Sequence, residues 1–210
     1  QGAADGGPSV GEGIAQSGAA FTARAAFRAS LLSYVTDTLG TAAPSAQNYA
    51  LSSYLGSPAP AGGFVLPLWS GIGALTVFGS YGSTLRLSQA SGNGRYNTSE
   101  NATGNWLDST RPFEIALSTP HTAFGFNMMD LGDFNAEVEV EFFLSGVKTR
   151  ALILPVLAAN KPLSDFMNVS YADGNLPFDR VLINITHPIG RPPNDAVGFD
   201  DFDVGHVVSC

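Results

Sequence analysis

The feature that most constrains the fold is the run AEVEVEFFL over residues 136–144. Acidic and apolar side chains alternate along it, with Glu137, Glu139 and Glu141 on one side and Val138, Val140 and Phe142 on the other. Successive side chains of a β-strand point to opposite faces, so the run predicts a half-buried strand with an acidic face in solvent. A cation ladder or a glycosidase carboxylate pair would use the same residues, but nothing places two carboxylates across a sugar-sized cleft.

Further short apolar or alternating segments follow one another with turn residues between them. They cover residues 64–69, 73–78, 84–88, 112–118, 122–129, 147–157, 178–186 and 196–208. Residues 89–110 contain no apolar run and indicate a long exposed excursion. Many short strands with turn signals predict an all-β fold, specifically a jelly-roll-like antiparallel β-sandwich.

The region before residue 41 differs from the rest. Residues 1–18 are rich in Gly and Ala and predict a flexible or donor-like N-terminal arm. Residues 19–35 place Phe27, Leu31 and Tyr34 on one stripe, which predicts a helix that ends by Gly40 at the latest. We therefore divide the chain into an arm at 1–18, a helix at 19–40 and a β-sandwich domain at 41–210.

Composition bounds the class of protein. The 210 residues are one domain's length, and the single cysteine, Cys210, excludes an internal disulfide framework. The net charge of −8 disfavours nucleic acid and bare anionic membranes as partners. The sequence contains no stretch of about 18 apolar residues, so no transmembrane helix is predicted. Only 13% of residues are charged, which favours an extracellular all-β protein over a cytosolic helical enzyme.

Four Asn-x-Ser/Thr sequons are present, at Asn97, Asn101, Asn168 and Asn184. Such sequons are the acceptors of N-glycosylation, and they predict a glycan-carrying surface outside the cell. Coincidence is the alternative interpretation, because a chain of this composition contains some sequons by chance.

Several motifs in a fixed order carry a family resemblance. GRYNT at 94–98 is followed by Trp106, FEI at 113–115, FGF at 124–126, DLGDF at 130–134 and GFDDFDVG at 198–205. This order resembles the extracellular β-sandwich domains that precede PEP-CTERM sorting signals in bacterial surface proteins. The resemblance implies an exported protein of the cell surface, biofilm matrix or exopolysaccharide layer, without enzymatic activity. The apolar helix and arginine cluster of the usual anchor are not among these residues, so tethering is not carried over.

Acidic residues gather at two predicted strand ends. They are Asp130, Asp133, Asp200, Asp201 and Asp203. Calcium binds six to eight oxygens from carboxylates, carbonyls and water, so these residues predict a structural calcium site. The alternative is that they cap turns and solvate strand ends. No other cofactor is indicated.

Aromatic and histidine residues give weaker signals. Trp69, Tyr96 and Trp106 are candidates for stacking on sugar rings, with rim or core packing as the alternative. His121, His187 and His206 lie far apart in sequence and match no zinc motif. No nucleophile motif or glycine-rich nucleotide loop is present, so we expect no enzymatic activity.

These observations lead to two hypotheses of different classes. The first is a non-enzymatic exported structural glycoprotein, a subunit of a matrix, surface layer or self-assembling fibre. Its partners would be glycans and further copies of itself, with Val10 and Ile14 of the arm pairing with a neighbour's sheet edge. The alternative for the arm is that it folds back on its own domain or stays loose. The alternative hypothesis is a carbohydrate-binding module, with or without a supporting calcium ion. Both place the protein outside the cell or on its surface.

Overall fold

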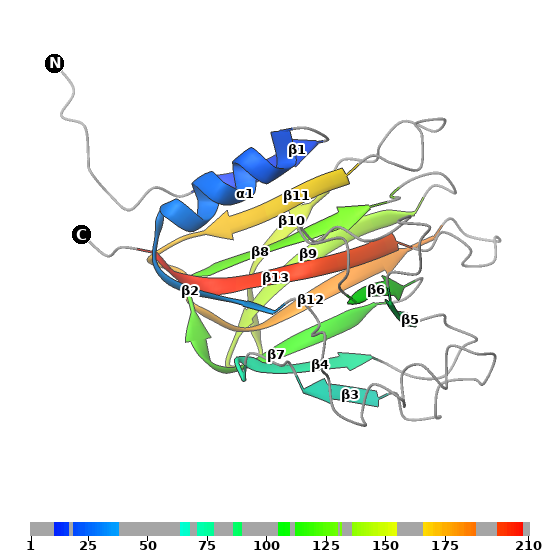
Figure 1. Cartoon of the computed structure of the whole chain (residues 1–210). Coiled ribbons are helices and arrows are strands. Elements are labelled where there is room, and N and C mark those ends of the chain that lie inside the picture. The colour runs from blue at the N-terminus through cyan, green and yellow to red at the C-terminus, as the bar shows by residue number, and fades with distance from the viewer. Residues whose placement is uncertain are drawn as a thin grey trace, which may run out of the picture.

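The computed structural model describes residues 11–16, 19–37, 64–67, 71–77, 86–89, 105–109, 112–129, 131, 136–154, 166–187 and 197–207. Within these residues the chain forms two antiparallel β-sheets and one short helix (Figure 1). Every strand pairing among them is antiparallel. The predicted jelly-roll-like β-sandwich is therefore confirmed.

The first sheet has the order β1-β11-β8-β13-β6-β5, with β2 pairing with β13 beside β6. Its strands are β1 (Gly11–Gln16), β2 (Leu31–Asp37), β5 (Arg86–Gln89), β6 (Asn105–Ser109), β8 (Ala123–Met129), β11 (Phe166–Ala172) and β13 (Val197–Val207). The second sheet has the order β10-β9-β12-β7-β4-β3. Its strands are β3 (Phe64–Pro67), β4 (Gly73–Val77), β7 (Phe113–His121), β9 (Glu137–Leu144), β10 (Val147–Ile153) and β12 (Phe178–Thr186).

A phenylalanine-rich core fills the space between the sheets. The rings come from β7, β8, β9, β12 and β13, and most meet edge to face or tilted; they are Phe113, Phe124, Phe126, Phe142, Phe178, Phe199 and Phe202. The ring centroids of Phe113 and Phe199 lie 5.0 Å apart, which joins the two sheets directly. Such contacts add to the hydrophobic gain of burying each ring.

The alternating run at 136–144 behaves as its pattern predicts. In β9, Val138, Val140 and Phe142 are buried in the core, while Glu137 is exposed and Glu139 and Glu141 are half-exposed. The outer face of the second sheet therefore carries charged side chains.

The helix is shorter than the sequence pattern predicts. Helix α1 spans Ala20–Ala29, and the chain then turns at Ser30 into β2. The run after Ser30 contains β-branched Val35 and Thr36, and pairing with β13 gives it backbone partners that a longer helix would not have. Leu31 and Tyr34 therefore lie in a strand, and the helix face toward the sheet carries Ala20, Arg24 and Phe27 instead.

The N-terminal arm is not free over its second half. Residues 11–16 form β1 at the edge of the first sheet, where Ile14 pairs with Val169 of β11 in the same chain. In this structure Ile14 therefore pairs within its own chain, as in the alternative that the arm folds back on its own domain, and not with another subunit. Val10 lies outside the described residues.

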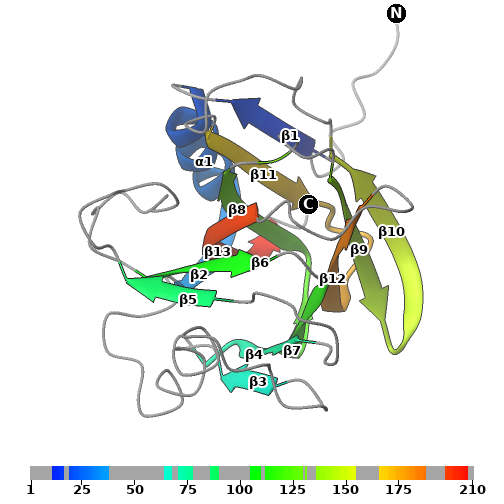
Figure 2. The same ribbon diagram turned by 90° about the vertical axis from the view of Figure 1, so that its right-hand side faces the viewer.

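Helix α1 packs on the outer face of the first sheet, which gives the molecule a third layer on that side (Figure 2). Apolar contacts hold both ends of the helix. Phe27 packs with Ala123, Ala172 and Val207 at one end, and Ala20 packs with Met129 at the other. The middle of the contact is polar and contains a network of side-chain hydrogen bonds and ion pairs.

Candidate functional site

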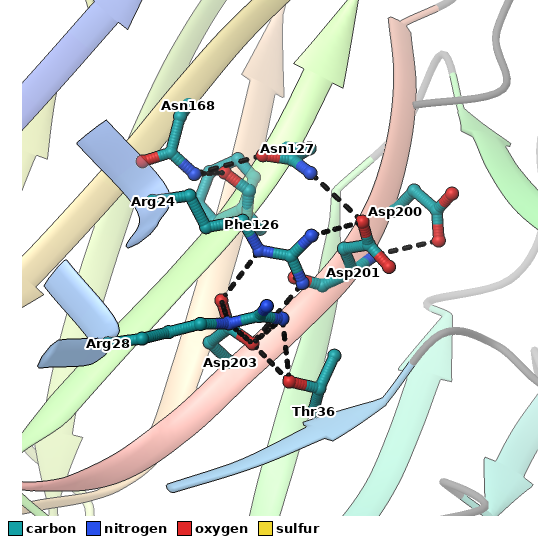
Figure 3. Close-up of polar contacts among 9 residues, drawn as sticks. All are labelled: Arg24, Arg28, Thr36, Phe126, Asn127, Asn168, Asp200, Asp201 and Asp203. Carbon is teal, nitrogen blue, oxygen red and sulfur yellow. Dashed lines mark hydrogen bonds and ion pairs between the residues drawn. The ribbon is translucent and has the colours of Figure 1, made fainter. Parts of the chain in front are cut away.

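Two groups of polar side chains stand out, one under α1 and one on the outer face of the second sheet. The first centres on Arg24, whose side chain is only 2% exposed. Arg24 lies four residues after Ala20 and three before Phe27, so helix geometry turns it toward the sheet. Its Nε donates to Asp203 Oδ2 at 2.8 Å, and its Nη1 donates to Asp201 Oδ2 (Figure 3).

Arg28 brings a second guanidinium to the same carboxylate. It lies one turn after Arg24, and its Nη2 donates to Asp203 Oδ1 at 2.9 Å. The hydroxyl of Thr36 in β2 donates to that oxygen as well. Asp203 thus joins α1, β2 and β13, and this explains why β2 lies beside β13 directly after the helix.

The network continues across the first sheet through two asparagines. Asn127 of β8 donates to Asp201 Oδ2 at 3.1 Å, and Asn168 of β11 donates to Asn127 Oδ1 at 2.9 Å. Asp200 Oδ1 accepts the backbone N–H of Asp201 at 2.7 Å. Because buried polar groups are costly when unpaired, this connected set stabilises one position of the helix on the sheet.

A β-bulge in β13 places the two carboxylates. The pairing of β13 with β8 shifts register between Asp200 and Asp203, and Asp201 has a φ of 56°. The extra residue lets Asp201 and Asp203 both contact Arg24 (Figure 3). In a regular strand residues 201 and 203 would share the core face with Phe199, and the extra residue moves them to the outer face while Phe202 joins the core.

The two carboxylates differ in how many guanidinium groups they contact. Burial alone lowers the pKa of Arg24, but its contacts with Asp203 and Asp201 outweigh burial and hold that pKa above its ordinary value. Burial raises the pKa of Asp201, and the attraction of Arg24 offsets this only in part. Asp203 receives both guanidinium groups, so Asp201 is the less well compensated carboxylate.

These contacts change the interpretation of the predicted calcium site. Oxygens of Asp201 and Asp203 are taken by guanidinium groups, and Asp200 is bonded within its own strand. Among the described residues no group of three or more His, Cys, Asp or Glu side chains is arranged to hold a metal ion. Asp130 and Asp133 lie outside the described residues, so their part of the calcium hypothesis stays a prediction.

The predicted glycosylation sites divide into three cases. Asn168 is 1% exposed and bonded beneath α1, so the prediction that it carries a glycan is wrong for the folded chain. Asn184 is half-exposed in β12, on the outer face of the second sheet, and stays a candidate. Asn97 and Asn101 lie outside the described residues.

The structure describes none of the predicted sugar-stacking side chains. Trp69 and Tyr96 are outside the described residues. Trp106 lies in β6, where its backbone pairs with Ser88 of β5, but its side chain is not described.

The second group of polar side chains crosses the outer face of the second sheet. Arg180 of β12 donates to Glu114 of β7 at 3.1 Å and lies over the ring of Phe143 of β9 at 4.0 Å. Lys148 of β10 donates to Glu141 of β9 at 3.2 Å. The side chains of Glu114 and Glu141 are 16% and 14% exposed, so they are partly buried but still open to solvent.

Cross-strand register brings these residues into one surface, which we call the β12 face. Leu182 pairs with Glu114 on one side and Glu141 on the other, and Asn184 pairs with Glu139. The face consists of Glu114, Glu139, Glu141, Phe143, Arg180, Leu182 and Asn184. The alternation in residues 112–118 and 136–144 predicted which side chains of β7 and β9 point outward, but no motif marked Arg180, Glu114 or Phe143 as a group.

The β12 face combines hydrogen-bond acceptors, hydrogen-bond donors and apolar groups. Its carboxylates accept hydrogen bonds, its guanidinium and amide donate them, and Phe143 and Leu182 add apolar surface. The ion pairs hold these groups in place before any ligand arrives. The arrangement suits a ligand with many hydroxyl groups and an apolar ring face.

Comparisons with known proteins give no family. No protein-family model matches the chain, and no curated protein matches it. Among solved structures, a mutant of a carbohydrate-binding module of family 29 is 12% identical over 83% of this chain and 93% of its own, with a TM-score of 0.38. The CBM51-2 and INT domains of Clostridium perfringens ZmpB are 10% identical over 63% of this chain and 29% of theirs, with a TM-score of 0.35.

A third solved structure is the catalytic domain of a GH87 alpha-1,3-glucanase in complex with nigerose. It is 14% identical over 61% of this chain and 27% of its own, with a TM-score of 0.32. TM-scores of this size carry no inference about ligand or activity. Among the described helices none is long and apolar enough to cross a membrane.

Proposed function

We propose that the protein is a non-catalytic glycan-binding module of the cell exterior, and that the β12 face is its binding surface. The observation that carries the proposal is the pair of ion-paired, partly exposed carboxylates on either side of β12, with Arg180 held between Glu114 and Phe143. The function that ranked second in the sequence analysis thus becomes the first. The resemblance to PEP-CTERM-associated surface proteins remains a prediction that is compatible with it.

A glycan presents vicinal hydroxyls on its edges and C–H groups on its ring faces. The two oxygens of Glu114 or Glu141 can accept from neighbouring hydroxyls, while Arg180 and Asn184 can donate to hydroxyl and ring oxygens. Phe143 and Leu182 offer apolar contact for the ring faces. Because hydrogen bonds to charged groups are stronger than neutral ones, a few such contacts dominate the affinity.

The proposal is tested by affinity gel electrophoresis against soluble β-glucan, glucomannan and α-glucan, followed by calorimetry on any polymer that retards the protein. Arg180→Ala and Glu141→Gln should each weaken binding by roughly tenfold, which corresponds to about 1.4 kcal/mol. Leu32→Ala is the matched control, because Leu32 is 67% exposed in β2 of the other sheet. No retardation by any polymer, or equal weakening in the control, would refute the β12 face as the site.

Self-association is a second candidate, favoured by apolar side chains on an edge strand. Within the described residues β2 pairs only with β13, and Leu32, Tyr34 and Val35 in it are exposed. Exposed edge strands with apolar side chains favour pairing with another chain, and a lysine on the edge opposes it. Light scattering after size exclusion should show assemblies that Leu32→Lys dissociates. A monomer at all concentrations excludes the structural-subunit hypothesis.

A further inference from the structure

Two of the three histidines meet where the sheets approach each other at one end of the sandwich. His121 is the last residue of β7 in the second sheet, and His206 is the penultimate residue of β13 in the first. Their ring centroids lie 4.8 Å apart with an angle of 21° between the planes. Both side chains are half-exposed, so solvent reaches the pair. The β12 face does not involve either residue.

The backbone around the pair is fixed by Thr122. Its N–H donates to the carbonyl of Gly205 at 3.1 Å, and its hydroxyl accepts the N–H of Val207 at 3.0 Å. Their partners, Gly205 and Val207, lie on either side of His206 in β13, and Thr122 directly follows His121. The Thr122 carbonyl also accepts the N–H of Asp173 at 2.9 Å. The two imidazoles therefore stand on a rigid corner rather than on free loops.

The tautomer of His121 is fixed as well. Its Nδ1 lies 2.7 Å from the carbonyl oxygen of Thr119. A carbonyl oxygen only accepts, so Nδ1 carries the proton and Nε2 keeps its lone pair in the neutral ring. Histidines that bind metal ions nearly always donate their other N–H to a carbonyl or carboxylate in this way.

We propose that His121 and His206 form a two-imidazole site for a divalent transition-metal ion such as Zn²⁺, Ni²⁺ or Cu²⁺, with water in the remaining coordination positions. Imidazole nitrogen suits these ions. Two imidazoles bound side by side at metal–nitrogen distances of about 2.0–2.1 Å hold their centroids roughly 4.5–5 Å apart, which matches the observed separation.

Binding requires one local change. The rings face each other, so one of them turns about its Cβ–Cγ bond to bring both lone pairs to one ion. His121 is held by Thr119, and the turn falls to His206, whose ring makes no hydrogen bond to a described residue. Because the two histidines belong to different sheets, the ion would link the sheets at this end and stabilise the folded chain.

The test uses calorimetry and thermal unfolding with ZnCl2 and NiCl2 in a Cys210→Ser background, which removes the only thiol. One ion should bind per chain and raise the melting temperature. His121→Asn and His206→Asn should each weaken binding by about tenfold or more, while His187→Asn, which removes the third histidine, should leave it unchanged. Equal binding in the His121→Asn/His206→Asn variant, or no binding at millimolar ion, overturns the proposal.

A measurement on the unsubstituted chain covers the case in which a variant does not fold. Diethylpyrocarbonate modifies accessible imidazoles, and peptide mass spectrometry reports each histidine separately. Zn²⁺ should protect His121 and His206 and leave the modification of His187 unchanged. Equal modification of all three with and without Zn²⁺ contradicts the site. Neither experiment depends on a glycan, so its failure leaves the β12 face proposal standing.

Discussion

The outer faces of both sheets carry ion pairs between arginine and carboxylate side chains, but the two sets of pairs differ in burial. On the first sheet, Arg24 contacts Asp201 and Asp203 beneath a helix, with all three side chains almost fully buried. On the second sheet, Arg180 contacts Glu114 where both side chains remain partly exposed. A buried ion pair is costly to break and fixes structure, whereas a surface pair contributes little to stability and stays available to a ligand. Burial, rather than residue type, separates the structural face from the candidate binding face.

The largest expected effect comes from removing Arg24. Arg24→Ala leaves Asp201 buried beneath α1 without its guanidinium partner and leaves Asp203 with Arg28 alone, so we expect the free energy of unfolding to fall by about 3–5 kcal/mol. Urea denaturation followed by circular dichroism measures it. Arg180→Ala should cost less than about 1 kcal/mol. If the two variants lose the same amount, the contrast between the faces is wrong.

A steric change should have a smaller effect on the covered face. A Cβ added at Gly205 would lie 2.3 Å from the Ser33 carbonyl oxygen in β2, so Gly205→Ala forces β2 away from β13. Overpacking of this kind typically costs about 1–3 kcal/mol. Ala116→Ser, on the exposed outer face of β7, is the control and should stay within about 0.5 kcal/mol. A thermal-melt series distinguishes these outcomes, and a Gly205→Ala protein as stable as the control contradicts the close β2–β13 contact.

The rim between the sheets should respond to pH. Burial lowers the pKa of His121 below its ordinary value of 6.5, and the nearby His206 lowers it further. The hydrogen bond to the Thr119 carbonyl opposes this shift without cancelling it. At pH values between the pKa of His121 in the folded chain and its pKa in the unfolded chain, the unfolded chain binds more protons. The free energy of unfolding therefore rises with pH in that range. The contribution of His121 is therefore complete above about pH 6.5 and decreases as the pH falls below it. Melts of metal-free protein from pH 7.5 to 5 should show this slope, and His121→Asn should flatten it.

The smallest expected effect concerns salt. The Glu114–Arg180 and Glu141–Lys148 pairs are partly exposed, and salt screens such pairs more than buried ones. Glu114→Gln should change the free energy of unfolding by less than about 1 kcal/mol, and the change should shrink in 1 M NaCl. The cost of Arg24→Ala should persist in the same salt. Equal salt sensitivity of both variants would remove the distinction between the two faces.

Period-two patterning identified much of the sandwich in advance. The alternation in residues 112–118 and 136–144 predicted both β7 and β9 and their buried faces. Residues 166–172 form β11, a strand that the sequence analysis did not predict, although Met167, Val169 and Tyr171 alternate with Asn168 and Ser170. The polar side chains of an alternating strand usually point to solvent, but Asn168 and Ser170 are buried on the side of the sheet that the helix covers.

The network under α1 could not be predicted from local sequence. Arg24 occupies a position on the buried stripe of the helix, yet arginine alone indicates solvent exposure. Its partners lie 177 and 179 residues away in the sequence, at a β-bulge that no sequence pattern predicts. The same distance explains why the aspartates were assigned to calcium and Asn168 to a glycan. The β12 face likewise depends on register between strands that are distant in sequence.

The position of β13 has a consequence for how the chain folds during synthesis. This strand pairs with β8, β6 and β2 and holds the carboxylates that Arg24 needs, yet it is the last strand described. Helix α1 precedes β13 by most of the domain, so it leaves the ribosome long before its partners exist. Until β13 emerges, α1 has no counter-charge for its buried arginine and the first sheet lacks the strand that joins its halves. Folding of this domain is thus completed after translation of β13, with little opportunity for stepwise assembly from the N-terminus.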